Sequence, residues 1–422
     1  MKRKLLRKLT ACILCISLLT VSVQLSIFAE TESSADSVGE PKDTEESTPP
    51  ESQPSVNDAY VLETVDAGSL ELKCKSAILM EASTGIVLYE QNADERLPPA
   101  SVTKIMTLLL IMEAVESGKI SLDDTVTASA HAASMGGSQI FLKEGEEMTV
   151  EEMLKSVIIA SANDAAVALA EYVFGSEESF VAEMNKKARA LGMDNTAFEN
   201  TNGLDDTVTE HLTTARDIAI MSRELIKYPK IIEYSSKWMD TVRDGAFGLT
   251  NTNRLVRFYR GCTGLKTGST SKAGFCVSAT AKRDGMELIC VIMGAETRDI
   301  RNAAAVSLLD WGFANYGVYT AEDGSTDPIR VKRGIKNLCA TEYAEFSCVL
   351  PKGEISSVTS EIEVEETLDA PVREGDTVGH VTYKCEGKTV GSIDIKAAES
   401  IERIGYFDIL KRMLTVFALK SA

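Results

Sequence analysis

Histidine is scarce in this chain. Only His131, His211 and His380 occur among 422 residues, and their spacing matches no metal-ligand pattern. The seven cysteines beyond residue 29 form no C-x-x-C pair, so a zinc site is not indicated either. Three histidines leave a Ser-His-Asp triad open, but none accompanies a serine in an elbow motif. We therefore expect no metal and no cofactor.

The chain also lacks a basic excess. It has 44 Lys and Arg against 63 Asp and Glu, which gives a net charge of −19 at pH 7. Loss of the five basic residues that precede Leu9 would lower this charge to −24. A protein so acidic is a poor candidate for binding nucleic acid or for general adhesion to anionic lipid. We therefore expect no nucleic-acid partner.

One apolar run, from Leu9 to Phe28, approaches the length of a membrane span. It follows a basic start and precedes Ala29-Glu30, a pattern typical of a secretory signal peptide over residues 1–29. A retained N-terminal anchor is the alternative. Both interpretations predict that the rest of the chain is exported. An odd number of cysteines in an exported protein leaves at least one thiol unpaired.

Composition and periodicity then change twice along the chain. Residues 30–58 are rich in Glu, Ser, Asp and Pro and can bury too little apolar surface to offset the ordering entropy, which predicts an acidic disordered tether. Residues 59–325 are long enough for one sizeable domain. Strand patterns at both its ends flank helical patterns, so we expect an α/β (α+β) fold with an antiparallel sheet and a helical subdomain. The expected hairpins cover 77–89 and 274–294, and the expected helices cover 101–116, 150–174 (two helices), 217–227 and 298–315.

Two further segments follow. Residues 326–397 carry short alternating runs with glycine turns, which predicts a small β-sandwich module. In residues 398–422 apolar residues recur every three or four positions, the pattern of an amphipathic helix. Its apolar residues are Ile401, Ile404, Phe407, Leu410, Leu414 and Phe417, and its basic residues are Arg403, Lys411, Arg412 and Lys420. This helix is too polar to span a membrane but suits a membrane interface. A helix packed on the β module is the alternative.

Three short motifs stand in one order: Ser101-Val-Thr-Lys104, Ser161-Ala-Asn163 and Lys266-Thr267-Gly268. Each is weak alone, because S-x-x-K recurs at Ser269/Lys272 and S-x-N recurs at Ser55/Asn57. Taken singly, the three could be a helix N-cap, a polar turn and a basic strand edge. Their order, their long gaps and their context together indicate a serine acyl-transfer enzyme that works without histidine.

Ser101 and Lys104 lie three residues apart at the start of an expected helix, so they share one face. A cation is disfavoured at the positive end of the helix dipole, and the apolar residues after Lys104 would desolvate its ammonium group. Both effects favour the neutral amine that a general base for a serine hydroxyl needs. The helix start also presents N–H groups that can face a developing oxyanion.

The other two motifs supply polar partners. We expect Ser161 to relay a proton towards the leaving group, and Asn163 to orient the catalytic lysine and bind a substrate amide. Lys266 and Thr267 suit a substrate carboxylate, and Gly268 allows a close backbone approach.

With these motifs the chain resembles the D-alanyl-D-alanine carboxypeptidases of the low-molecular-mass penicillin-binding proteins. The likeness extends from about Cys74 to the C-terminus. It includes Thr201-Asn-Gly-Leu-Asp205, Thr214-Ala-Arg-Asp217 and the segment from Met293 to Arg301. The resemblance implies the penicillin-recognising serine transferase fold. It also implies that Ser101 attacks the peptide bond between two D-alanines of a peptidoglycan stem pentapeptide.

The resemblance implies further roles and partners. The N–H groups of Ser101 and Ser269 would form the oxyanion hole, Arg301 would meet the substrate carboxylate, and water would resolve the acyl-enzyme. The partners would be stem peptides ending in D-Ala-D-Ala, β-lactam antibiotics as inhibitors, and a membrane surface contacted by the C-terminal helix. The expected location is the outer face of the cytoplasmic membrane, facing the cell wall. One departure is Ser269 itself, where some members of the family carry histidine.

Two rival functions share some of these features. A class A β-lactamase has the same motifs but needs a deacylating glutamate in an E-x-x-L-N stretch, and Glu210-His-Leu-Thr-Thr214 does not match it. A cell-wall scaffold with a dead site is the other rival. The intact Ser101, Lys104, Asn163 and Lys266 argue against a dead site.

Overall fold

The computed structural model describes residues 65, 68, 70–206 and 208–419. The predicted signal peptide over 1–29 and the predicted tether over 30–58 lie outside this part of the chain. So do the second S-x-N match at Ser55/Asn57 and the last basic residue of the tail, Lys420.

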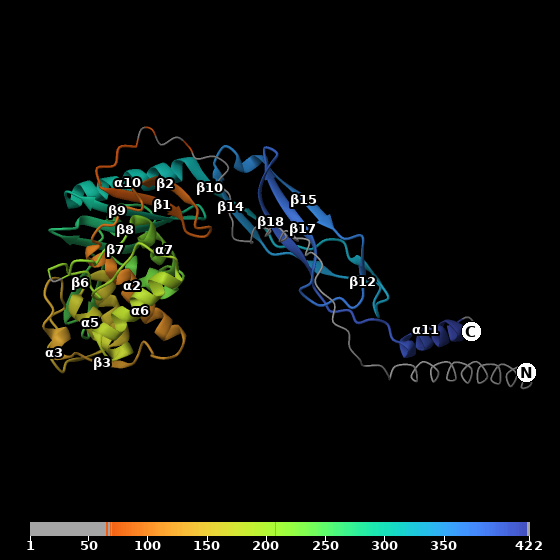
Figure 1. Ribbon diagram of the computed structural model, residues 1–422, viewed down its shortest axis with the longest axis horizontal. Helices are drawn as coiled ribbons and strands as arrows, with labels where there is room; N and C mark the ends of the chain where they lie inside the picture. Colours follow the sequence, from red (N-terminus) through yellow and green to blue (C-terminus); the bar gives the residue numbers. More distant parts are fainter. Residues whose placement is uncertain (1–64, 66–67, 69, 207, 420–422) are drawn as a thin grey trace, which may run out of the picture. The chain divides into compact units, whose positions relative to one another are not determined.

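A five-stranded antiparallel sheet lies in the first domain, with α10 on one face and the helices of the subdomain on the other (Figure 1). Its strands, in spatial order, are β2 (Val87–Gln91), β1 (Ser76–Glu81), β9 (Met286–Ala295), β8 (Gly274–Arg283) and β7 (Cys262–Thr270). Because β1 pairs with β9, the sheet joins the two ends of the domain, which confirms the predicted fold class. Alternate residues of β9 enter different cores: Cys290 packs with α10 (Arg298–Asn315), and Val291 packs with the helical subdomain.

The helix α2 (Lys104–Glu116) lies at the centre of the helical subdomain. Ten of its 13 residues are buried, as expected for a helix that is apolar all round. Residue 101 does not begin this α-helix as predicted; it lies in η1 (Ala100–Thr103), a 3-10 turn that packs against β7. The other elements of the domain are β3 (Thr125–Thr127), α3 (Ala130–Ala133), β4 (Glu147–Thr149), α4 (Val150–Ile159), α5 (Asn163–Phe174), α6 (Glu177–Ala190), α7 (Ala215–Leu225), α8 (Pro229–Ser235), β5 (Met239–Val242), β6 (Phe247–Thr250) and α9 (Leu255–Phe258).

Local sequence signals set the ends of the helices that carry the site. Thr149 and Glu152 form a capping box at the start of α4. Thr297 caps α10 by accepting a backbone N–H in the first turn. Between α4 and α5, Ser161 has a φ of 63°, in the left-handed region that side chains avoid. The chain therefore turns sharply at the second motif, between the two predicted helices.

The second part of the chain is β-rich and has its own hydrophobic core. Its elements are β10 (Tyr316–Ala321), β11 (Ile329–Lys332), β12 (Leu338–Cys339), β13 (Thr341–Glu342), β14 (Phe346–Pro351), η2 (Ile355–Ser357), β15 (Val358–Val364), β16 (Thr367–Asp369), β17 (Thr377–Cys385) and β18 (Lys388–Ala397). A final helix, α11 (Tyr406–Leu419), follows. No helix in the described part of the chain is both long enough and apolar enough to cross a membrane.

The tail helix begins later than the sequence pattern indicated. It starts at Tyr406, and the residues from 399 to 405 are not helical. Ile401 forms a β-bridge with Val372 and is fully buried in the core of the β module. It was therefore wrong to include Ile401 in the helical stripe, and Ile404 and Arg403 also precede the helix. The error arose because Ile401 lies three positions before Ile404. This spacing matches that of a helix by coincidence.

Candidate active site

Ser101 lies in the tight turn before the core helix. The preceding Ala100 has a φ of 49°, and a Cβ added to Gly203 would lie 1.9 Å from the Ala100 carbonyl oxygen. Only glycine fits there, so the two chain segments are in direct contact. The turn leaves Ser101 half-buried in the wall of a cleft. Lys104 Nζ lies 3.0 Å from Ser101 Oγ, so the two side chains meet as their spacing predicts.

Lys104 has no exposed surface and is surrounded by acceptors. Its Nζ lies 2.6 Å from Asn163 Oδ1 and 2.8 Å from the carbonyl oxygen of Asn202. Burial lowers the pKa of Lys104 well below 10.5, and the charge of Lys266 lowers it further, against an opposing effect of Asp164. The amine is therefore neutral over a wider pH range than that of an exposed lysine, as a general base requires.

The second motif connects the two lysines of the site. Asn163 accepts from Lys104 through Oδ1, and its Nδ2 donates to the carbonyl oxygen of Gly136 at 2.7 Å. These two bonds fix the orientation of the amide. A substrate amide would therefore use the remaining N–H of Asn163. Ser161 lines the cleft, and its Oγ lies 2.8 Å from Lys266 Nζ.

The third motif lies on β7. Lys266 is 1% exposed, and burial, followed by the charge of Arg301, lowers its pKa to about 7. The hydroxyl of Thr267 donates to Thr252 Oγ1 at 2.8 Å, which orients it at the cleft wall. No sequence signal indicated Thr252, because it follows a short strand with no motif of its own.

Gly268 allows β7 to lie directly against the turn that carries the nucleophile. A Cβ at this position would lie 2.8 Å from the backbone nitrogen of Ser101, so a larger residue would push the two segments apart. Ser269 follows and is exposed at the cleft. The competing S-x-x-K match at Ser269/Lys272 is not assembled, because Lys272 Nζ donates to the carbonyl oxygen of Asp205.

All three motifs contribute residues to one cleft of about 660 Å³. Arg301, from α10, also lines this cleft although only 2% of its surface is exposed. Its guanidinium group donates to Asn302 Oδ1 and to the carbonyl oxygen of Cys276, which are both neutral acceptors. Burial lowers the pKa of Arg301 to about 10, so the group stays charged at neutral pH. The cleft therefore holds a cation that can bind a carboxylate.

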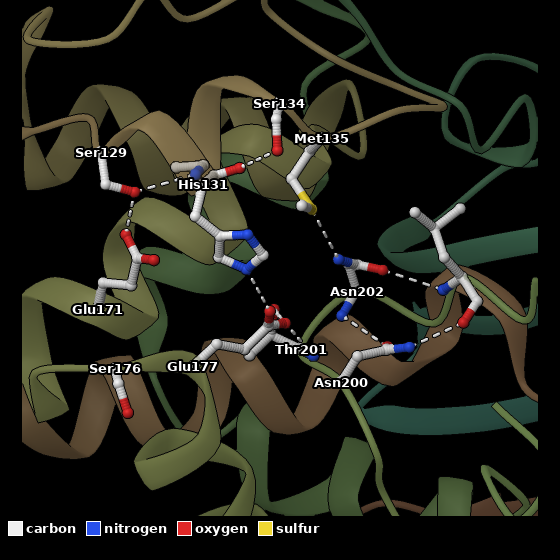
Figure 2. Close-up of polar contacts among 12 residues, drawn as sticks. Ser129, His131, Ser134, Met135, Glu171, Ser176, Glu177, Asn200, Thr201 and Asn202 are labelled. Carbon is white, nitrogen blue, oxygen red and sulfur yellow. Dashed lines mark hydrogen bonds and ion pairs between the residues drawn. The ribbon is translucent and has the colours of Figure 1, made fainter. Parts of the chain in front are cut away.

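The Thr201–Asp205 loop, part of the family resemblance but of none of the three motifs, holds Lys104 from the other side. Next to Asn202, the N–H and hydroxyl of Thr201 donate to Glu177 Oε1 at 3.0 and 2.7 Å. The other oxygen of Glu177 lies 2.8 Å from His131 Nε2 (Figure 2). The Asn-Gly dipeptide is a turn signal that could have indicated the loop. Nothing local could have indicated Glu177, which comes from the start of α6.

The Glu210 to Thr214 segment, compared above with the E-x-x-L-N stretch of a β-lactamase, does not line the cleft. Glu210 is exposed and lies 3.8 Å from Arg96. His211 is buried beneath the nucleophile turn, with Nε2 2.7 Å from Thr103 Oγ1 and Nδ1 accepting the N–H of Glu199 at 2.9 Å. The Glu210 to Thr214 segment therefore supports the turn and supplies no carboxylate to the cleft.

Family comparisons agree with this geometry. A family model for D-alanyl-D-alanine carboxypeptidases matches residues 63–297, and a model for the C-terminal domain of penicillin-binding protein 5 matches residues 330–403. The chain is 45% identical to the D-alanyl-D-alanine carboxypeptidase DacF of Bacillus subtilis, over 81% of this chain and 89% of that protein. It is 37% identical to the D-alanyl-D-alanine carboxypeptidase DacC of Escherichia coli, over 82% of this chain and 88% of that protein.

Solved structures give the same result. Penicillin-binding protein 5 from Haemophilus influenzae shares 32% identity with a TM-score of 0.70, over 79% of this chain and 98% of that chain. Penicillin-binding protein D2 from Listeria monocytogenes, in its ampicillin-bound form, shares 33% identity with a TM-score of 0.54, over 58% of this chain and 99% of that chain. The chain therefore belongs to the D-alanyl-D-alanine carboxypeptidases, the penicillin-binding serine peptidases in which a β-rich domain and a short helix follow the catalytic domain.

Proposed function

We propose that Ser101 is the nucleophile of this D-Ala-D-Ala carboxypeptidase and that Lys104 is its base. One observation carries the proposal: Lys104 Nζ lies 3.0 Å from Ser101 Oγ, and the lysine is wholly buried. The neutral amine accepts the hydroxyl proton while Oγ bonds to the carbonyl carbon between the two D-alanines. The N–H groups of Ser101 and Ser269 then stabilise the oxyanion.

The second and third motifs move the remaining protons. As the C–N bond breaks, Ser161 Oγ gives its proton to the leaving nitrogen and regains one from Lys266 Nζ, 2.8 Å away. In the second half-reaction water attacks the ester. One proton of this water passes to Lys266 and restores its ammonium form, while Lys104 returns the first proton to Ser101 Oγ. A lysine with a pKa of about 7 can both give and take a proton at neutral pH.

Arg301 and Thr267 bind the carboxylate of the terminal D-alanine. Both line the cleft, and Arg301 has only neutral partners among the described residues. A guanidinium group binds a carboxylate through two parallel hydrogen bonds. A β-lactam carries a carboxylate and a reactive carbonyl in the same relation, so it acylates Ser101 as the peptide does. The resulting ester resists water.

The test uses the Ser101→Ala variant with two reagents. We expect it to lose both labelling by a fluorescent penicillin and release of D-alanine from a muramyl pentapeptide, while the wild type shows both. Mass spectrometry of the labelled wild type should place the penicilloyl group on Ser101. A label on Ser161 or Ser269, which also line the cleft, would overturn the assignment.

The proposed location is the outer face of the cytoplasmic membrane. The signal-like pattern over residues 1–29 predicts export, and α11 provides peripheral attachment. Large apolar side chains of α11 face solvent: Phe407 is 81% exposed and Leu414 is 62% exposed. A protein this acidic needs such a local apolar stripe, because its net charge opposes binding to anionic lipid.

A further inference from the structure

Two more arginines line the cleft beside Arg301. Arg298 lies one helical turn before Arg301 on α10, so the two share a face of the helix. Arg254 comes from the residue just before α9. Both are exposed, whereas Arg301 is buried. All three arginines line one cleft, and the charges of Arg298 and Arg254 both contribute to the lowered pKa of Arg301.

Arg254 and Arg298 have no carboxylate partner among the residues that the structure describes. In the described part of the chain the side chains of Arg254 and Arg298 make no ion pair and no hydrogen bond, although acidic residues outnumber basic ones by 63 to 44. Among the described residues Asp299 is the one carboxylate that acts on the pKa of Arg301, and its effect is smaller than those of Arg298, Cys276 and Arg254. A cluster of like charges is unfavourable unless an anion joins it.

The position of the cluster tells which part of a substrate it meets. This step rests on the proposed function, in which Arg301 binds the carboxylate of the residue after the scissile bond. Arg254 and Arg298 line the same cleft and their charges act on Arg301, which assigns them to the leaving-group side of the cleft. Phe258, 72% exposed, and Trp238 line the same region and give it an apolar wall. The cleft therefore offers both guanidinium groups and apolar surface to a leaving group larger than D-alanine.

We propose that Arg254 and Arg298 form a second anion subsite, which binds an additional carboxylate carried by the leaving group. The ligand class is a D-amino acid with a side-chain carboxylate, or a peptide whose residue after the scissile bond carries one. Two guanidinium groups on different elements can bind such a carboxylate from two directions. The enzyme then cleaves D-Ala–X bonds in which X is dicarboxylic, in addition to D-Ala-D-Ala.

The test compares two blocked peptides, one ending in D-Ala-D-Glu and one in D-Ala-D-Gln. They differ only in a side-chain carboxylate against a side-chain amide. The wild type should release D-Glu with a kcat/KM about tenfold or more above that for D-Gln, the effect of a charged hydrogen bond. In the double variant Arg254→Gln/Arg298→Gln the ratio should fall to about one. Arg257→Gln is the matched control, because Arg257 stacks on Trp238 and Phe258 and does not line the cleft. It should keep the wild-type ratio.

The outcomes separate this proposal from the one on which it rests. A wild-type ratio near or below one, no cleavage of the D-Glu peptide, or a double variant that keeps the preference would each overturn the second subsite. Those results would leave the assignment of Ser101 intact if the wild type still releases D-alanine from a D-Ala-D-Ala peptide. Failure of that release would overturn the proposed function itself.

Discussion

Lys266 Nζ lies 2.8 Å from Ser161 Oγ, although the two residues are 105 positions apart. This contact joins the second and third motifs, as the 2.6 Å contact between Lys104 and Asn163 joins the first and second. Two lysines are thus buried in one site without a carboxylate hydrogen-bonded to either, among the described residues. Such burial is unfavourable for folding and favourable for proton transfer.

Replacing Lys266 with Met should flatten the dependence of stability on pH. The pKa of Lys266 is about 7 when folded and 10.5 as a free side chain. Between these values the unfolded chain binds more protons, so wild-type stability rises with pH. The free-energy penalty for burying the Lys266 ammonium group is complete below pH 7 and absent above pH 10.5. When the unfolding free energy is plotted against pH, the slope for the wild type should exceed the slope for Lys266→Met by up to about 1.4 kcal/mol per pH unit.

Urea unfolding at several pH values between 7 and 10 measures this slope. Lys282→Met removes an exposed lysine of β8 and serves as the control, with a slope close to that of the wild type. Equal slopes for the wild type and Lys266→Met would show that Lys266 is not neutral in the folded protein at these pH values.

Lys104→Arg should be nearly as damaging as Lys104→Ala. Arginine keeps the charge and the length of the side chain but stays protonated, so it cannot accept the proton of Ser101. Loss of a general base lowers rates by about 10²- to 10⁴-fold. The measurement is the second-order rate constant of acylation by a penicillin at neutral pH. Substantial acylation of the Arg variant would mean that Lys104 acts only through its charge.

Arg301→Ala should discriminate between two forms of one substrate. With a free terminal carboxylate the peptide loses a charged hydrogen bond, which reduces kcat/KM by roughly 10- to 100-fold. The amidated peptide has no terminal charge for Arg301 to bind, so its kcat/KM should fall less. Arg283→Ala is the control. It breaks a 3.3 Å ion pair with Asp310, and Arg283 does not line the cleft, so kcat/KM should change equally for both peptides. Equal losses on both peptides in Arg301→Ala would indicate a structural role.

Glu177→Ala should slow acylation by about tenfold, because the loop that holds the Asn202 carbonyl against Lys104 loses its anchor. Displacement of that carbonyl removes an acceptor of the ammonium form, so the pH midpoint of acylation should move down. Glu177→Gln keeps an acceptor for Thr201 and should restore much of the rate. His131→Ala is the control and should have a small effect. An unchanged midpoint in Glu177→Ala would refute the positioning role.

Deleting residues 406–422 should release the signal-cleaved protein from membranes without changing hydrolysis of soluble peptides. The deletion removes α11 but keeps Ile401 in its core. Deleting residues 399–422 removes Ile401 as well and should also lower the melting temperature. Phe407→Glu with Leu414→Glu should mimic the shorter deletion, because it places charge in the apolar face. Continued sedimentation of the shorter form with membranes would instead indicate a retained N-terminal anchor.

Local sequence patterns were sufficient to predict much of the secondary structure. The helix predicted over 298–315 is α10 with the same bounds, and the hairpin at 274–294 is β8 and β9. These succeeded because caps, turn glycines and apolar periodicity act within a few residues. Local patterns also indicated Ser101, Lys104 and the other motif residues as candidates, because each motif is a short run of residue types that acyl transfer needs.

Tertiary structure decided what local spacing could not. Two S-x-x-K segments have the same pattern, but only Lys104 meets its serine, while Lys272 donates to a loop carbonyl. Ile401 continued a helical spacing but lies in the core of the β module. Thr252 and Glu177 carry no motif, and Asn202 lies in the Thr201–Asp205 segment, to which the resemblance gave no role. All three reach the site from distant segments. Burial and charge around a lysine depend on the whole packed domain, so its pKa follows from the fold and not from its neighbours in sequence.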